Sequence, residues 1–194
     1  MRAVPRCLQH IASVWRMSDL VVVAASQEAT YLPDDVPLVL TGVGMAQAAV
    51  ATTRAILEHR PSRVVNLGSV GTLDPTLVGI QRPSAVINRD LNPEQIRAAG
   101  LTPDARIELG GDGPVLGTGD SFVAGGPERE AALARCRLVD MEGFAIAHAC
   151  RELGVELVMI KHVSDPADES SLAWKDVVDR SARALAEAYE AIRR

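Results

Sequence analysis

The chain has 194 residues, a net charge of −5 at neutral pH and a sequence pI of about 5.4. An acidic protein of this kind lacks the basic surface that nucleic-acid phosphates need, so we expect a small-molecule ligand. Hydrophobic residues make up 47% of the chain and aromatic residues only 3%, which predicts one core built from Ala, Val, Leu and Ile. No apolar run approaches the ~20 residues that span a bilayer, so a membrane anchor is not expected.

The three cysteines, Cys7, Cys136 and Cys150, are an odd number and include no C-x-x-C pair. We therefore expect neither a disulfide framework nor a metal site, and the reducing cytosol is the predicted compartment. No motif in the chain indicates a cofactor.

Residues 1–18 form a basic start, with Arg2, Arg6 and Arg16 and no acidic residue. Such a start is typical of a transit peptide, but also of a simple N-terminal extension or of an upstream start codon with Met17 as the working initiator. We predict an N-terminal extension over 1–18 and a single folded domain over 19–194.

From Asp19 onward, strand-like and helix-like runs alternate along the chain. Apolar runs predict strands at 19–25, 36–41, 64–67, 85–88, 115–116 and 155–163, and another just before Asp140. Helices are predicted at 45–59, 93–99 and 141–153, and a last one carries an apolar stripe of Val178, Ala182, Leu185, Tyr189 and Ile192. This alternation predicts an α/β fold with helices on both faces of a parallel or mixed sheet.

Four motifs stand at the expected ends of strands. They are Asn66–Gly71 (NLGSVG), Gly117–Val123 (GTGDSFV), Asp140–Glu142 (DME) and Ser164–Asp168 (SDPAD). Taken alone, each has an ordinary explanation, because a Glu at a helix start complements the helix dipole and an Asp after a strand forms a turn. In α/β folds, however, ligands collect beyond the carboxyl ends of the strands. We therefore expect the four motifs to converge on one site.

In this order, the four motifs resemble those of the purine nucleoside phosphorylase and nucleosidase superfamily, most closely its methylthioadenosine/S-adenosylhomocysteine nucleosidase branch. The resemblance covers the chain from about residue 20, and it implies that Asn66–Gly71 forms a turn at the end of a strand. It implies a three-layer α/β/α fold with a central mixed, mostly parallel sheet, and a purine nucleoside as the small-molecule partner. It also implies a homodimer, for which the alanine-rich helices after Gly44 and Met141 could form the contact.

The resemblance also implies a role for each site residue. Glu142 would bind the ribose hydroxyls, and Phe122 would stack on the base. Asp165 would protonate or hydrogen-bond purine N7, and Ser164 would help to orient its carboxylate. Glu28 would activate the attacking water. The implied catalytic residues are thus Glu28 and Asp165, and the implied substrate-binding set is Gly68, Ser69, Phe122, Val123, Asp140, Met141, Glu142 and Ser164.

Water and phosphate place different demands on the site. Water needs a base, which Glu28 can supply, whereas phosphate needs cations, and no Arg or Lys lies between Ala24 and Gly44. This contrast predicts hydrolysis. The resemblance implies a 5'-modified adenosine as the substrate, so the predicted function is an N-ribosyl hydrolase that acts on such a nucleoside. Two alternatives stay open: a phosphorylase that uses Arg89 as a phosphate ligand, and a catalytically silent nucleoside-binding protein.

The sequence departs from the family pattern in three places, and two of these departures, the missing second Glu and the short segments, make the silent nucleoside-binding protein possible. Ala29 stands where relatives often have a second Glu, and the segments 30–35 and 91–113 are short, which predicts a more open 5' pocket or a different nucleoside. Lys161 and His162 replace the usual Arg-Ala pair. We expect His162 to face a neighbouring helix or a subunit interface rather than the substrate.

Overall fold

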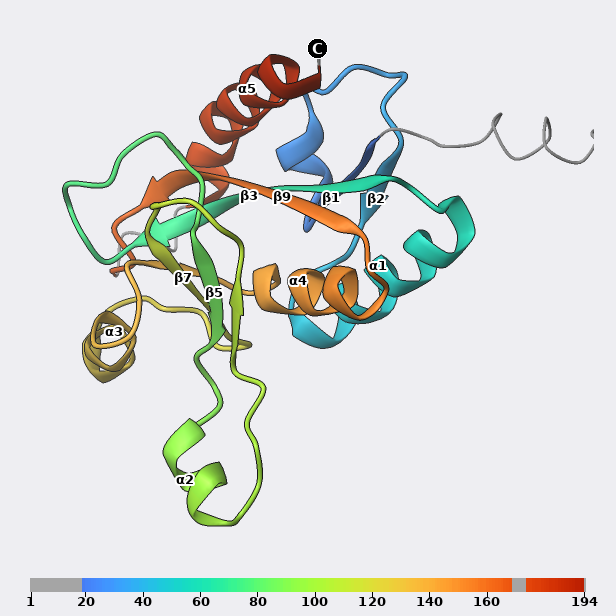
Figure 1. Cartoon of the computed structure of the whole chain (residues 1–194). Coiled ribbons are helices and arrows are strands. Elements are labelled where there is room, and N and C mark those ends of the chain that lie inside the picture. Colours follow the sequence, from blue (N-terminus) through green and yellow to red (C-terminus); the bar gives the residue numbers. More distant parts are fainter. Residues whose placement is uncertain (1–18, 169–173, 194) are drawn as a thin grey trace, which may run out of the picture.

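The computed structural model describes residues 19–168 and 174–193, so the predicted extension over 1–18 lies outside the described residues. Figure 1 shows a central sheet with helix α5 (Trp174–Arg193) on one face and helices α1 (Met45–His59) and α4 (Gly143–Glu152) on the other. Two of the core clusters occupy these two interfaces, one between the sheet and α5 and one between the sheet and the α1–α4 pair. The predicted three-layer α/β/α fold is confirmed.

Within the described residues, nine strands form one sheet. Five of the strand pairs are parallel and three are antiparallel, as expected for a mixed, mostly parallel sheet. The strands are β1 (Asp19–Val23), β2 (Leu38–Leu40), β3 (Arg63–Thr72), β4 (Ile80–Gln81), β5 (Ala85–Asn88), β6 (Arg106–Glu108), β7 (Val115–Thr118), β8 (Leu138–Asp140) and β9 (Glu156–Asp165).

Strand β3 joins the two halves of the sheet. Its first residues pair with β1, most of its length runs parallel to β9, and its last residues, Gly71 and Thr72, pair with β8 in the antiparallel direction. The end of β8 therefore points back along β3, toward Gly68–Gly71. This junction brings the DME motif, the glycine motif and the end of β9 to one place.

The glycine motif is part of strand β3, so the prediction that it forms a strand-ending turn was wrong. Pairing with β9 continues past it, from Arg63 to Gly71. The glycines are needed for close approach instead of for a turn. A Cβ on Gly68 would lie 3.2 Å from Lys161 Nζ, and a Cβ on Gly71 would lie 3.1 Å from both Asp165 Oδ1 and Val139 Cγ2.

Helix α1 has the bounds that the sequence predicts. Gly44, with a φ of 99°, begins it, and Arg60 ends it in the left-handed conformation before Pro61. The apolar stripe of the last helix is also confirmed, because Val178, Ala182, Leu185 and Tyr189 are buried and Ile192 packs against the core cluster that contains Leu185 and Tyr189.

Other elements differ from the prediction. Strand β9 continues to Asp165, and helix α3 (Gly126–Leu133) and the short strands β4 and β6 were not predicted. Helix α2 (Pro93–Ala98) was predicted, and it stands on an arm that extends from β5 and β6 away from the sheet (Figure 1). Cys136 and Cys150 are buried free thiols. No helix in the described part of the chain is long and apolar enough to cross a membrane.

Candidate active site

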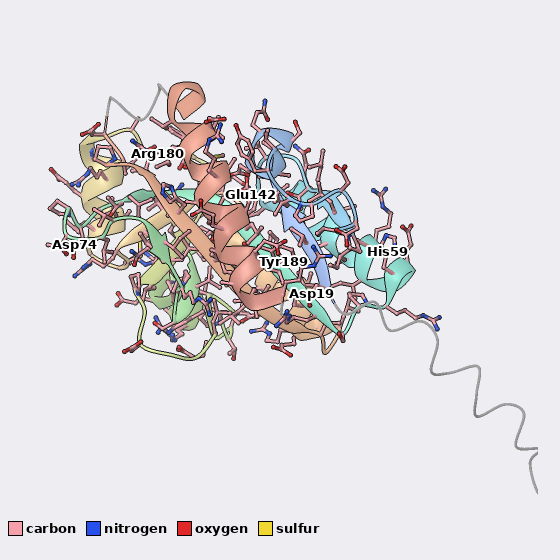
Figure 2. All side chains as sticks on the ribbon, turned by 90° about the horizontal axis from the view of Figure 1, so that it is seen from above. Asp19, His59, Asp74, Glu142, Arg180 and Tyr189 are labelled. Carbon is pink, nitrogen blue, oxygen red and sulfur yellow. The ribbon has the colours of Figure 1, made fainter. Side chains whose placement is uncertain are left out.

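A cavity of about 380 Å³ opens at the junction of β3, β8 and β9. Nine of the ten predicted site residues line it, and they come from segments far apart in the sequence. Figure 2 shows one of them, Glu142, well inside the molecule, whereas His59 and Asp74 stand at its edges. The nine are Glu28, Ser69, Phe122, Val123, Asp140, Met141, Glu142, Ser164 and Asp165. Gly68, the tenth, is not in the wall and lies against Lys161.

Glu28 is held in place by the glycine motif. It sits in a short 3-10 turn, η2 (Ser26–Ala29), directly after β1, and its side chain is buried. Ser69 donates two hydrogen bonds to Glu28 Oε1, from its backbone N and its hydroxyl, each at 2.7 Å. Glu28 Oε2 accepts a longer bond of 3.3 Å from the backbone N of Ala25. Oε1 is thus anchored, and Oε2 is the less constrained oxygen.

Glu142 lies at the N-cap position of α4 and is buried. Its Oε1 accepts a hydrogen bond of 2.9 Å from the backbone N of Gly44, the residue at the start of α1. Burial, followed by the nearby charge of Asp140, raises the pKa of Glu142 to about 7. Because the charge of this carboxylate is poorly solvated, hydrogen bonds from the hydroxyl groups of a ligand would stabilise its ionised form.

Asp140 lines the cavity, but its carboxylate is already engaged by the protein. Its Oδ1 accepts a bond of 2.6 Å from the Thr118 hydroxyl, and its Oδ2 accepts one of 3.0 Å from the backbone N of Gly143. Lys161 Nζ lies 2.9 Å from the same Oδ2, and the Lys161 side chain is only 2% exposed. Lys161 thus supplies a buried positive charge next to the Asp140 carboxylate of the site.

Asp165 ends β9 and is held by the residues around it. Its Oδ2 accepts a bond of 2.5 Å from the Ser164 hydroxyl, and its Oδ1 accepts one of 3.0 Å from the backbone N of Ala167. The predicted orienting contact between Ser164 and Asp165 is therefore present. His162, two residues before Ser164 on the strand, points to α5 instead, where its Nδ1 lies 2.9 Å from the Ser181 hydroxyl, as predicted.

The opposite wall combines an apolar segment with a cation. Phe122 is 45% exposed and lines the cavity beside the buried Val123, so its ring is available to a ligand. Among the described lining residues, Arg89 is the only cation. Its guanidinium donates to the Ser121 hydroxyl at 3.1 Å, to the Gly119 carbonyl at 3.2 Å and to the Ser121 carbonyl.

A comparison with protein-family models identifies the family. The model described as "Phosphorylase superfamily" matches residues 29–91 and 112–194, well over half of the chain. The chain belongs to the phosphorylase superfamily. The prediction of this family is thereby confirmed.

Nucleosidases are among the proteins that the chain resembles. The chain is 25% identical over 188 residues to the 5'-methylthioadenosine/S-adenosylhomocysteine nucleosidase of Staphylococcus aureus, a match that covers 81% of each protein. It is similar in fold to the Helicobacter pylori nucleosidase with 5'-methylthioadenosine in its active site, with a TM-score of 0.80 at 18% identity over 90% of this chain and 96% of that one. A mutant of the futalosine hydrolase of H. pylori gives a TM-score of 0.78 at 18% identity, over 90% and 97% of the two chains.

Several site residues of this superfamily member were not predicted from the sequence. Val43 reaches the cavity from a loop and carries no distinctive signal, whereas Ser121 belongs to the GTGDSFV motif and could have been found there. Thr118, which anchors Asp140, stands inside the GTGDSFV motif and could have been found there. Within residues 19–168 and 174–193, no group of three or more His, Cys, Asp or Glu side chains could hold a metal ion.

Proposed function

We propose that the protein is an N-ribosyl hydrolase that cleaves the glycosidic bond of a 5'-modified adenosine, releasing the free base and a ribose derivative. The observation that carries the proposal is the charge pattern of the cavity. Glu28, Glu142 and Asp165 all line it, and Arg89, the one lining cation in the described chain, already donates to backbone carbonyls. This arrangement suits water and a developing sugar cation better than it suits a phosphate dianion.

Glu142 is the proposed sugar ligand. With Oε1 bonded to Gly44, its Oε2 remains to accept from the ribose hydroxyls. These bonds become stronger as positive charge develops on the ribose in the transition state, because the hydroxyl protons become more acidic. Interactions that are stronger in the transition state than in the ground state are the ones that accelerate a reaction.

The proton balance of the reaction involves Glu28 and Asp165. Glu28 Oε2 accepts a proton from water while the water oxygen forms a bond to the anomeric carbon. As the bond from that carbon to the purine nitrogen breaks, its electron pair moves into the base, and Asp165 hydrogen-bonds N7 and delivers a proton there. Phe122 stacks on the departing base. Transfer of the proton from Glu28 to solvent and protonation of Asp165 then restore the starting state.

The test is base release in phosphate-free buffer, with analysis of the sugar product. We expect free sugar, no acceleration by added phosphate, and loss of turnover in Glu28→Gln while a nucleoside analogue still binds. Strict dependence on phosphate, with a ribose 1-phosphate product, would favour phosphorolysis. Tight binding of adenine with no turnover under either condition would indicate the silent nucleoside-binding protein.

The 5' group and the base are the finer part of the proposal. The S. aureus relative is named for methylthioadenosine and S-adenosylhomocysteine, and one solved relative is a futalosine hydrolase. We propose 5'-methylthioadenosine and S-adenosylhomocysteine as the first substrates to assay, with a futalosine-type nucleoside beside them. The comparison of kcat/KM values across this panel decides the 5' preference.

We also propose a homodimer, formed through α1 and β2. Helix α1 exposes Val50 (68% exposed) and Leu57 (60% exposed), whereas the alanines of α4 are buried in the protein's own core and cannot form the predicted contact. The exposed apolar side chains of this surface are Leu38, Leu40, Val43, Val50 and Leu57. Because Val43 also lines the cavity, a partner on this surface would border the site. Light scattering should give a dimer at micromolar concentration and a monomer for Val50→Asp.

The cytosol is the proposed compartment. Cys136 and Cys150 are buried as free thiols, and burial raises the pKa of Cys136 to about 11 and that of Cys150 to about 12. Cysteines that are not joined in disulfides are typical of proteins in reducing compartments. Fractionation of source cells with an antibody to the protein tests this location.

A further inference from the structure

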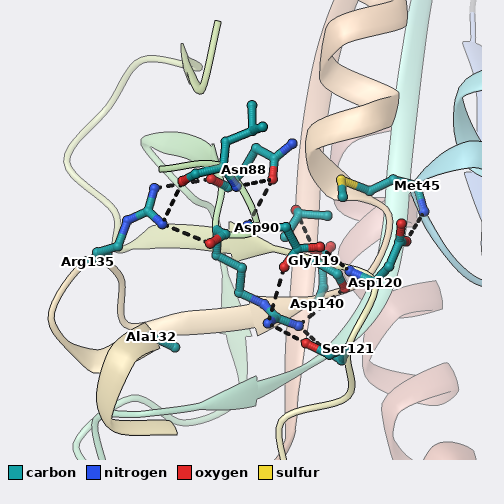
Figure 3. A network of polar contacts seen from close by, with 12 residues as sticks. Met45, Asn88, Asp90, Gly119, Asp120, Ser121, Ala132, Arg135 and Asp140 are labelled. Carbon is teal, nitrogen blue, oxygen red and sulfur yellow. Dashed lines mark hydrogen bonds and ion pairs between the residues drawn. The ribbon is translucent and has the colours of Figure 1, made fainter. Parts of the chain in front are cut away.

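A network of polar contacts joins two sides of the cavity. The base side is the segment Ser121–Val123, and the sugar side is the start of α1 with Glu142. Figure 3 shows the network at the ends of β5 and β7. Arg89, just after β5, donates from its guanidinium to the Ser121 hydroxyl, the Gly119 carbonyl and the Ser121 carbonyl. Its own backbone N donates to the Thr118 carbonyl at 2.8 Å. Arg89 therefore holds the segment that leads directly into Phe122 and Val123.

The fit between Arg89 and this segment is close. The Arg89 side chain is 8% exposed, and a Cβ on Gly119 would lie 2.6 Å from its Cζ and 2.7 Å from its Nε. The guanidinium thus packs directly on the glycine backbone. Arg89 Nε is buried and has no hydrogen-bond partner, an arrangement that lowers stability. Because the buried Nε lowers the stability of the fold, the contacts of Arg89 are better explained by the segment that they position than by a gain in stability.

Arg135 holds Arg89 from the other side. From the turn between α3 and β8, its guanidinium donates to the carbonyls of Asn88 at 3.1 Å, Arg89 at 2.8 Å and Leu91 at 3.2 Å. In Figure 3 Arg135 lies on the left of the network and Ser121 on its lower right. The backbone that carries Arg89 is thereby fixed by a second arginine.

A third branch reaches the sugar side. Asp90 Oδ2 accepts a bond of 2.7 Å from the backbone N of Asp120, and Asp120 Oδ1 accepts one of 2.7 Å from the backbone N of Met45. The neighbouring Gly44 N is the donor to Glu142. The loop that carries Phe122 and the helix end that holds Glu142 are therefore joined through one side chain, Asp120.

We propose that Arg89 is a positioning residue for the base-binding segment Ser121–Val123, that Arg135 supports it, and that Asp120 sets this segment relative to the sugar-binding Glu142. The proposal rests on the proposed function, because it takes Phe122 and Val123 as the contacts of the base. It assigns Arg89 to the protein's own loop and so removes it as a phosphate ligand.

The test compares Arg89→Met, Arg89→Lys and a matched control, Arg97→Met, in which an exposed arginine of α2 is changed. Charge-assisted hydrogen bonds are worth about 1.5–3 kcal/mol, or roughly 10- to 100-fold in affinity. In Arg89→Met we expect the affinity for adenine to fall by this factor. The kcat/KM for the purine nucleoside should fall by the same factor, mainly because KM rises. Arg89→Lys should recover only part of this loss, because its ammonium lacks the planar fork with which the guanidinium bonds Gly119 and Ser121. Arg97→Met should match the parent.

A nitrophenyl riboside separates positioning from a general loss of structure, since its leaving group has no purine edge to read. Its cleavage should change less than about threefold in Arg89→Met. Equal losses on both substrates, or an unchanged adenine affinity, would overturn the proposal. Adenine binding by calorimetry does not depend on turnover. If the parent binds adenine but hydrolyses no nucleoside, the proposed function fails while the Arg89 variants still decide the positioning role.

Discussion

Replacing Glu142 by Gln gives the most informative single change. The amide keeps the size of the side chain but carries no charge, so it loses the charge-assisted bonds to the ribose hydroxyls. One such contact to charge that develops in the transition state is worth about 2.7–4 kcal/mol, which corresponds to a fall in kcat of roughly 100- to 1000-fold. The bond from Gly44 N can be kept by the amide oxygen, so the start of α1 should stay in place.

The pH dependence provides a second readout for the same residue. Burial and the charge of Asp140 raise the pKa of Glu142 from 4.5 to about 7. The ionised form is the one that accepts from the ribose, so kcat/KM of the parent should rise as pH increases through about 7. In Glu142→Gln this rise should disappear. Near-parental turnover in the variant, or the same rise around pH 7, would refute the reasoning.

Stability should change in the opposite direction from activity. Because the folded pKa of Glu142 lies above the unfolded value, its contribution to stability is fully present below pH 4.5 and is lost as pH rises through about 7. Above pH 7 the parent holds a poorly solvated charge that Glu142→Gln lacks. Urea unfolding at pH 8 should therefore show a more stable variant, by up to about 3 kcal/mol for a shift of this size. A strongly destabilised variant would mean that lost activity reports damage to the fold.

Two further changes test the remaining charges. Asp165→Asn should reduce cleavage of a purine nucleoside by at least about 100-fold, and that of a nitrophenyl riboside far less, because the nitrophenolate leaves without a proton; parallel losses would make Asp165 a structural residue. Lys161→Met should lower the free energy of unfolding by about 3–5 kcal/mol, because it leaves the Asp140 carboxylate buried without its cation. The double variant with Asp140→Asn should regain part of that loss, and a single variant within about 1 kcal/mol of the parent would contradict the buried pair.

The fold was predictable from the sequence where local signals and packing agree. The glycine before Met45 and the Pro61 after the helix mark both ends of α1, and the apolar stripe of the last helix matches the buried side of α5. The glycine motif was misinterpreted because two glycines in a short run suggest a turn. Their purpose depends on Lys161 and Asp165, which approach from β9 and cannot be placed by local sequence.

The convergence of the predicted site residues on one cavity was predictable for a related reason. Carboxylates that follow strands, such as Glu142 and Asp165, come together in a layered α/β fold. Their order along the chain was therefore sufficient to predict that they lie close together. The engagement of Asp140 by Lys161 could not be predicted, because it depends on the antiparallel pairing of β8 with the end of β3. Likewise, the contacts of Arg89 depend on how a loop folds back on itself.

The most direct test of hydrolysis follows the oxygen atom. The parent enzyme is incubated with 5'-methylthioadenosine in ¹⁸O-labelled water, with and without phosphate. The sugar product is trapped by reduction, and its mass is measured by mass spectrometry. If Glu28 activates water, one labelled oxygen appears at the former anomeric carbon at the same rate in both buffers, and Glu28→Gln yields none. Unlabelled 5-methylthioribose 1-phosphate, formed only when phosphate is present, would contradict the account.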